Sequence, residues 1–336
     1  MLPLPLMHRL VRYTVAGELP PVALTAAACW NADPESIAYV RSSANHIFRF
    51  SQGGAPCYLR LSPAPERSLA FLAGEVDWLR DLHARGLPVA FPQPSDRGAW
   101  IEILTDPADG LAYHAAAFAA LPGLAWLEPE ELTAAQRRDW GRLAARLHTA
   151  GDVFQPRPGA PRRPDWRARW QAAADSLPPD EPAARAVLAQ GLAWLAETAA
   201  SGPWGGSWGG PWGLIHGDLE LDNLVWDGAA FAALDFDDCG YGPPAVDLAL
   251  ALRDVWAPPD GGPAAQEVLA AYAEQRPLPP DIAAQINFAL QVESAVQFAR
   301  LQRALAPFPD GDPPWVLPLR ARLELRLAEL RRGLCA

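Results

Sequence analysis

Residues 214–252 read LIHGDLELDNLVWDGAAFAALDFDDCGYGPPAVDLALAL, and the rest of the chain is organised around this stretch. Short apolar runs lie on both sides of Asp227-Gly228, a dipeptide typical of tight hairpin turns, so the stretch predicts two paired strands. Asn223 precedes the first strand and Asp235 follows the second. The hairpin therefore brings Asn223 and Asp235 close together.

These two residues have the chemistry of a metal site. Carboxylate and amide oxygens, with no thiolate or His pair nearby, suit a hard cation such as magnesium better than zinc. Asn223 and Asp235 are therefore the predicted metal ligands. Asp218, five residues before Asn223, is the predicted catalytic group that accepts or orients the proton of an acceptor hydroxyl. The three side chains together predict phosphoryl transfer.

The linked motifs resemble those of the aminoglycoside phosphotransferase and choline/homoserine kinase-like superfamily: HGD, an Asn five residues after the Asp, DFDD, then Pro-Pro-x-x-Asp-Leu-Ala. Protein kinases use H-R-D, the same step to Asn, and D-F-G; here Gly217 replaces the Arg and Asp237 the final Gly. The resemblance implies an α+β, two-lobed protein-kinase-like fold. Residues 1–121 would form a small N-lobe with an antiparallel sheet and one main helix, and residues 122–336 a larger, mostly helical C-lobe.

The same resemblance implies an ATP- and Mg2+-dependent phosphotransferase that moves the γ-phosphoryl group to a hydroxyl of a small molecule such as an amino alcohol or amino sugar. Two alternatives stay open. One is a protein Ser/Thr kinase of the bacterial stress-response type, against which the lack of an APE-type segment after DFDD counts. The other is a nucleotide-binding pseudokinase. The identity of the acceptor does not follow from the motifs, because many acceptors share them.

Four residues in the first third of the chain match nucleotide-binding positions of the resembling fold. Arg60 stands in the third strand, where a Lys is usual, and Glu75 lies fifteen residues later on a predicted helix over 66–85. We expect Arg60 and Glu75 to pair. Arg60 keeps the positive charge but not the geometry of Lys. Ser43 and Asn45 lie in a connection without GxGxxG; we expect its backbone N–H groups to meet phosphate oxygens, a plain hairpin turn being the alternative.

Three further residues surround the central motif. His216 is predicted to be a scaffold residue that holds the loop by a hydrogen bond near the DFDD strand. Asp247 follows Pro243-Pro244 and is predicted to cap a helix and brace the catalytic loop. Glu220, two residues past Asp218, would repel ATP oxygens, so we expect it to contact the acceptor and to favour an amino-bearing substrate.

Composition excludes several classes of protein. The net charge of −11 argues against nucleic-acid binding. The sequence contains no lysine, which excludes a Walker-type phosphate loop and a Lys Schiff base. The four cysteines are scattered without CxxC, so reduced thiols in a cytoplasmic protein are expected. No apolar run approaches the roughly 20 residues of a membrane span, and MLPLPLMHRL is a poor signal peptide.

The remaining segments are assigned from hydrophobic periodicity and from the positions of Gly and Pro. A repeat of Gly and Trp occupies residues 202–213; it predicts either a flexible repeat expansion or a substrate-facing aromatic loop. Residues 152–166 are proline-rich and predict an irregular linker. Helices are expected over 130–150, 166–176, 182–200, 264–304 and 316–332.

Overall fold

A computed structural model describes residues 1–125, 127–201 and 212–335 of the chain. The Gly/Trp repeat therefore lies outside the described residues except for its last two. The chain forms two compact units, each described below by itself. Unit 1 contains Met1–Val76, Phe91–Ala120 and Phe298–Ala336, and unit 2 contains Asp77–Ala90 and Leu121–Gln297. Units 1 and 2 do not have the bounds of the two predicted lobes, because unit 1 also contains Phe298–Ala336 and unit 2 also contains Asp77–Ala90. The division into lobes at residues 121 and 122 stays a prediction.

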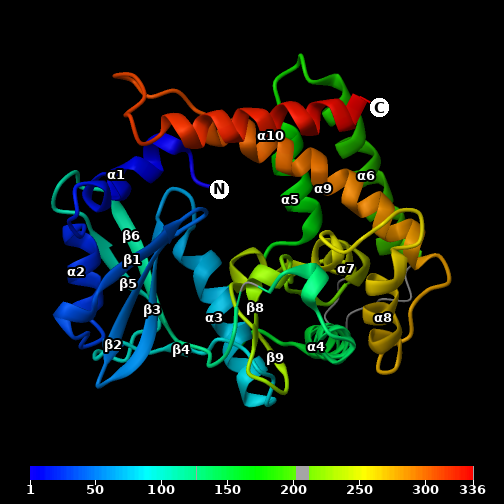
Figure 1. The fold of residues 1–336 in the computed structure, drawn as a ribbon, viewed down its shortest axis with the longest axis horizontal. Coiled ribbons are helices and arrows are strands. Elements are labelled where there is room, and N and C mark those ends of the chain that lie inside the picture. Colours follow the sequence, from blue (N-terminus) through cyan, green and yellow to red (C-terminus); the bar gives the residue numbers. More distant parts are fainter. Residues whose placement is uncertain (126, 202–211, 336) are drawn as a thin grey trace. The chain divides into compact units, whose positions relative to one another are not determined.

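Unit 1 is built on a six-stranded antiparallel sheet in the order β1-β2-β3-β6-β4, with β5 also paired to β6 (Figure 1). In β2 the side chains of His46, Phe48 and Phe50 are buried and alternate with more exposed neighbours, the period of a half-buried strand. Gly53 and Gly54 adopt positive φ between β2 and β3, as a tight hairpin turn requires. The strands are β1 Ala38–Ser42, β2 His46–Gln52, β3 Ala55–Pro63, β4 Pro92–Gln93, β5 Glu102–Thr105 and β6 Ala112–Ala119.

Helices α1 Leu4–Val15 and α2 Pro21–Ala28 belong to unit 1 and contribute to the core beneath the sheet. The core joins Leu10 of α1 and Val22 of α2 to Phe48 and Leu59 of the sheet. Helix α1 was not expected, although Pro3 at its N-cap and Pro5 near its start suit a first helical turn. The C-terminal helix α10 spans Leu317–Cys335.

Unit 2 is mostly helical, as the mixed fold class predicts. The expected helix over 264–304 is two helices, because Pro277, Pro279 and Pro280 lie between α8 and α9 and proline cannot continue a helix. Helices α3 and α9 contribute residues to both units. The helices are α3 Leu69–Ala84, α4 Ala134–Val153, α5 Trp166–Ser176, α6 Pro182–Ser201, α7 Pro244–Leu252, α8 Gly262–Ala273 and α9 Ile282–Ala304.

Two small strand pairs in unit 2 frame the central motif. β7 Leu214–Ile215 pairs with β10 Gly240–Tyr241, and β8 Leu224–Trp226 pairs with β9 Phe231–Ala233. The second pair is the predicted hairpin, whose turn is held by the Asp227 carboxylate accepting from the N–H groups of Ala229 and Ala230. None of the described helices is both long and apolar enough to cross a membrane.

Candidate active site

The β8–β9 hairpin positions the two predicted metal ligands. Leu224 lies opposite Ala233 in the register of the pair. One residue further out, the Leu234 N–H donates to the carbonyl oxygen of Asn223 at 3.0 Å. Asp235 follows Leu234 directly, so the hairpin places Asn223 and Asp235 beside each other as the sequence predicted.

Asp218 and Asn223 are joined by direct hydrogen bonds. The Asn223 Nδ2 donates to the backbone oxygen of Asp218 at 2.8 Å and to its carboxylate Oδ2 at 3.1 Å. Asn223 lies in the one-turn helix Leu221–Asn223 and is buried. Because its nitrogen faces Asp218, its amide oxygen points to another side. Metal binding by this oxygen stays a prediction.

Asp235 has an unusual backbone conformation. Its φ and ψ are both 61°, in the left-handed region, which costs a non-glycine residue about 1–2 kcal/mol. Such strain persists only where the surroundings fix it, and it is concentrated at functional sites. The next residue, Phe236, is fully buried against Trp78 and the ring of His216, which anchors the strained segment.

Arg163 also holds the segment that follows Asp235. This buried side chain donates to the carbonyl oxygens of Asp237 at 2.7 Å and Cys239 at 2.8 Å. Arg163 lies in the stretch that was predicted to be an irregular linker. The sequence did not single out Arg163, because it is one of several arginines in a proline-rich run. Through the two hydrogen bonds of Arg163, the predicted linker supports the DFDD segment.

His216 fixes the backbone of the catalytic loop. Its Nε2 lies 3.0 Å from the carbonyl oxygen of Leu234, and its Nδ1 lies 3.2 Å from the Asp218 nitrogen. A neutral ring with its proton on Nε2 satisfies both contacts. Burial lowers the pKa of His216 below its ordinary value, more than nearby Asp247 raises it, and this favours the neutral ring. The geometry is the one predicted for a scaffold residue.

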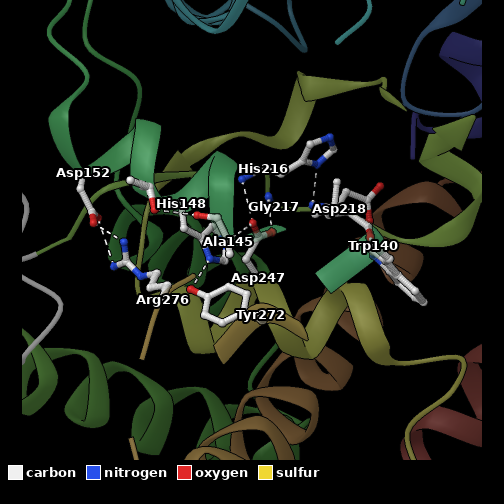
Figure 2. Close-up of polar contacts among 12 residues, drawn as sticks. Trp140, Ala145, His148, Asp152, His216, Gly217, Asp218, Asp247, Tyr272 and Arg276 are labelled. Carbon is white, nitrogen blue, oxygen red and sulfur yellow. Dashed lines mark hydrogen bonds and ion pairs between the residues drawn. The ribbon is translucent and has the colours of Figure 1, made fainter. Parts of the chain in front are cut away.

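Asp247 accepts from three donors with both of its oxygens (Figure 2). Oδ2 accepts from the His216 N–H at 3.0 Å and from His148 Nε2 at 2.8 Å, and Oδ1 accepts from the Gly217 N–H at 2.7 Å. Burial would raise the pKa of Asp247, but His148, His216 and the Gly217 N–H together hold it below its usual range. The expected helix cap was wrong: α7 begins at Pro244, and Asp247 lies in its first turn.

A second layer supports Asp247. His148 Nδ1 lies 2.9 Å from the hydroxyl of Tyr272, and both side chains are buried. Burial raises the pKa of Tyr272 and keeps its hydroxyl protonated, and this hydroxyl holds the His148 ring whose Nε2 faces Asp247. The sequence gave no signal that His148 and Tyr272 would meet, because α4 and α8 come together only in the folded unit.

Gly217 is the residue that replaces the Arg of protein kinases. Its φ is +83°, and a Cβ atom there would lie 2.5 Å from the Asp238 carbonyl oxygen and 2.6 Å from the Trp166 indole. Only glycine fits both the backbone conformation and the space. Trp166 is therefore packed directly on the catalytic loop.

Two further acidic side chains have partners of their own. Glu220 forms an ion pair with Arg253, and Asp238 lies 3.3 Å from Arg169. The contact predicted between Glu220 and the acceptor stays a prediction. The structure shows its carboxylate engaged with Arg253.

In unit 1, Arg60 and Glu75 form the predicted pair. Two parallel bonds join them, Nη1 to Oε1 at 2.8 Å and Nη2 to Oε2 at 2.6 Å. Their side chains are 4% and 1% exposed, so the pair is buried and bidentate, the geometry that arginine favours over lysine. A role in nucleotide binding stays a prediction.

The connection between β1 and β2 is tied internally. Asn45 is buried, and its Oδ1 accepts from the Ser62 hydroxyl at 2.7 Å. The Ser43 N–H donates to the Asn45 carbonyl oxygen at 3.0 Å. The Asn45 side chain thus braces the turn from inside the unit, and phosphate binding by this backbone stays a prediction.

The donor set of the hairpin fits magnesium. Among residues 1–125, 127–201 and 212–335, no three His, Cys, Asp or Glu side chains form a metal cage. Magnesium is usually bound by one or two protein carboxylates together with substrate phosphates and water rather than by such a cage. An amide oxygen from Asn223 and a carboxylate from Asp235 match that pattern.

A kinase-like fold with this site defines a phosphotransferase. The model of the phosphotransferase enzyme family matches residues 39–284, so the chain belongs to that family. It is also similar to the amicoumacin kinase of Bacillus subtilis (strain 168), with 24% identity over 238 residues that cover 70% of this chain and 68% of that protein.

Solved structures show the same fold. An amicoumacin kinase in complex with AMP-PNP, Ca2+ and Ami aligns with a TM-score of 0.76 and 21% identity over 92% of this chain and 91% of that chain. The microcompartment-associated aminopropanol kinase aligns with a TM-score of 0.68 and 23% identity over 92% and 94%. The predicted α+β kinase-like fold and the predicted family are confirmed, and these matches support a small-molecule phosphotransferase.

Proposed function

We propose that this protein is an ATP- and Mg2+-dependent kinase that transfers the γ-phosphoryl group to a hydroxyl of a small, amine-bearing molecule. The observation that carries the proposal is the bonded pair of Asp218 and Asn223 beside Asp235 on the hairpin. Two similar proteins support the acceptor class, since one is an amicoumacin kinase and the other an aminopropanol kinase.

Asp218 is the proposed catalytic base. The acceptor oxygen forms a bond to the γ-phosphorus as the bond from that phosphorus to the β–γ bridging oxygen breaks. ADP leaves, and the hydroxyl proton passes to the Asp218 carboxylate. Because the transition state is loose, the main task of Asp218 is to orient the hydroxyl. The Asn223 amide, bonded to Oδ2, restricts the carboxylate for that task.

Asn223 and Asp235 are the proposed magnesium ligands. When bound, the ion neutralises charge on the phosphate oxygens. The chain prepares the two ligands in different ways: Asn223 is oriented by Asp218, and Asp235 by its fixed left-handed backbone. Arg60, held by Glu75, is the proposed phosphate-binding cation, and the backbone around Ser43 and Asn45 is proposed to contact phosphate oxygens.

The proposal is tested by incubating the purified protein and ATP with a panel of amino alcohols and amino sugars, with Mg2+ or with EDTA. Acceptor-dependent ADP and a new phosphate monoester in the 31P NMR spectrum are expected only with Mg2+. Phosphate transfer to casein but to no small molecule would favour the protein kinase. Nucleotide binding without any transfer would favour the pseudokinase. Either result would contradict the proposal.

A further inference from the structure

Glu293 is a buried carboxylate on α9 that the proposed reaction does not use. It is 8% exposed. Its Oε1 accepts from two indole N–H groups, Trp166 at 2.8 Å and Trp170 at 2.7 Å. No donor among the described residues reaches Oε2, and this oxygen is not among the fully enclosed polar atoms without a partner. One oxygen of Glu293 is therefore saturated, and the other is open.

The charge of Glu293 is not explained by these bonds. Both indoles are neutral donors, so a glutamine oxygen would serve them equally well. No described side chain forms an ion pair with Glu293. Of the two arginines on α5, Arg167 is exposed, and Arg169 lies over the Trp166 ring and pairs with Asp238. A mostly buried anion gains more from a cationic partner than from neutral donors alone. The open oxygen therefore suits a cation that is not part of the chain.

Trp166 connects this carboxylate to the catalytic loop. One edge of the indole donates to Glu293, and the opposite edge touches Gly217, the residue before Asp218. Glu293 and the loop thus lie on opposite edges of one indole ring. All of these residues belong to unit 2. A ligand that reaches from the open oxygen to Asp218 must span the width of that ring.

We propose that Glu293 is the anchor for the ammonium group of the acceptor. This assignment rests on the proposed function and narrows its substrate class to hydroxyl compounds whose primary or secondary ammonium lies several bonds from the reacting hydroxyl. The Oε2 atom accepts a charge-assisted hydrogen bond from the ammonium. Trp166 and Trp170 hold the carboxylate in place through Oε1.

The direct test is binding, measured by 15N NMR of the indole N–H groups. Signals are assigned with Trp166→Phe and Trp170→Phe. Glucosamine and 5-amino-1-pentanol are titrated, with glucose and 1,5-pentanediol as matched neutral probes. The two signals should move with the ammonium probes and stay still with the neutral ones. If no ammonium probe moves the two signals of the parent protein, Glu293 does not bind the ammonium group. This outcome does not depend on the folding of a Glu293 variant.

The second test is kinetic and uses Glu293→Gln, which keeps an oxygen for both indoles and removes the charge. KM for an ammonium acceptor should rise roughly 10- to 100-fold, the effect of losing a hydrogen bond between charged groups, with kcat changed far less. An equal KM in parent and variant would overturn the proposal. The two proposals can fail separately. If the ammonium probes shift the indole signals but no phosphate is transferred, the proposed kinase function is wrong and the ammonium site is still supported.

Discussion

Asp247 and Glu293 are both buried carboxylates of unit 2, and both are connected to the catalytic loop, but their hydrogen bonding differs. Asp247 uses both oxygens, and its donors come from His148 and from two backbone N–H groups. Glu293 uses one oxygen, and its donors are two indoles. Both oxygens of Asp247 are therefore occupied, whereas Glu293 keeps one oxygen open.

The difference separates a structural carboxylate from a binding carboxylate. A saturated buried anion is stable without a ligand, and its removal leaves donors unsatisfied. An anion with an open oxygen is poorly stabilised by the chain alone and gains most from an external cation. Burial by itself does not distinguish the two cases. The comparison is therefore tested by how much the free energy of unfolding and the activity change when each carboxylate is replaced by its amide.

The largest effect is expected for Asp247→Asn. An amide nitrogen would face at least one of the N–H donors, so the free energy of unfolding should fall by about 3–5 kcal/mol, as when a buried pair is broken. The turnover rate should fall about 100-fold because the loop is displaced. Urea unfolding and ADP formation measure both. Asp180→Asn, at an exposed position, is the control and should change neither. A stable, active Asp247→Asn would show that the network is dispensable.

The next effect is expected for Gly217→Ala. Gly217 donates its N–H to Asp247 and is packed against Trp166. Gly228 also has positive φ, but nothing lies within 4 Å of its Cβ position, so Gly228→Ala carries only the backbone cost. Thermal and urea unfolding should show Gly217→Ala less stable than Gly228→Ala by about 1–3 kcal/mol. Equal losses would mean that Trp166 moves aside freely.

The pH dependence of stability tests the neutral histidines. Burial lowers the pKa of His216 and lowers that of His46 to about 3. As the pH falls below 6.5, these histidines become protonated in the unfolded chain but not in the folded protein. The free energy of unfolding should therefore fall by up to about 1.4 kcal/mol per pH unit for each histidine. Urea unfolding from pH 7.5 to 4.5 measures the slope, and His46→Gln should flatten it. A flat profile in the parent would show that His46 and His216 are not held neutral by the folded protein.

The smallest effect on stability is expected for Glu293→Gln. The amide oxygen keeps both indole bonds and an uncompensated charge disappears, so the free energy of unfolding should change by less than about 1 kcal/mol, or rise. Urea unfolding in parallel with Asp247→Asn gives the contrast directly. A loss as large as that of Asp247→Asn would mean that Glu293 is structural too, and the two carboxylates would no longer differ.

Much of the fold and of the site was predictable because local patterns specify it. The hairpin follows from Asp227-Gly228 between apolar runs, and the adjacency of Asn223 and Asp235 follows from the hairpin. The Arg60–Glu75 pair followed from spacing within the resembling fold. The antiparallel sheet of unit 1 was expected from the resembling fold, and its strand β2 shows the alternation of a half-buried strand.

The parts that were missed depend on contacts between distant segments. His148, Tyr272 and Asp247 come from α4, α8 and α7, and no spacing in the sequence connects them. Arg163 and Trp166 lie near the end of the proline-rich stretch 152–166, which was predicted to be a linker. Glu293 sits in a helix with no acidic motif. The Asp247 cap was wrong because Pro243-Pro244 start the helix one turn earlier than the carboxylate suggested.

The most direct test of the central claim compares Asp218→Asn with Asp222→Asn in a single-turnover phosphate-transfer assay. The two aspartates lie four residues apart and undergo the same chemical change, but Asp222 is exposed and Asp218 is bonded to Asn223. Asp218→Asn should lower the transfer rate at least about 100-fold, the lower range for a positioned proton acceptor, while Asp222→Asn transfers at the parent rate. Equal rates in Asp218→Asn and the parent would contradict the assignment of Asp218 as the catalytic base.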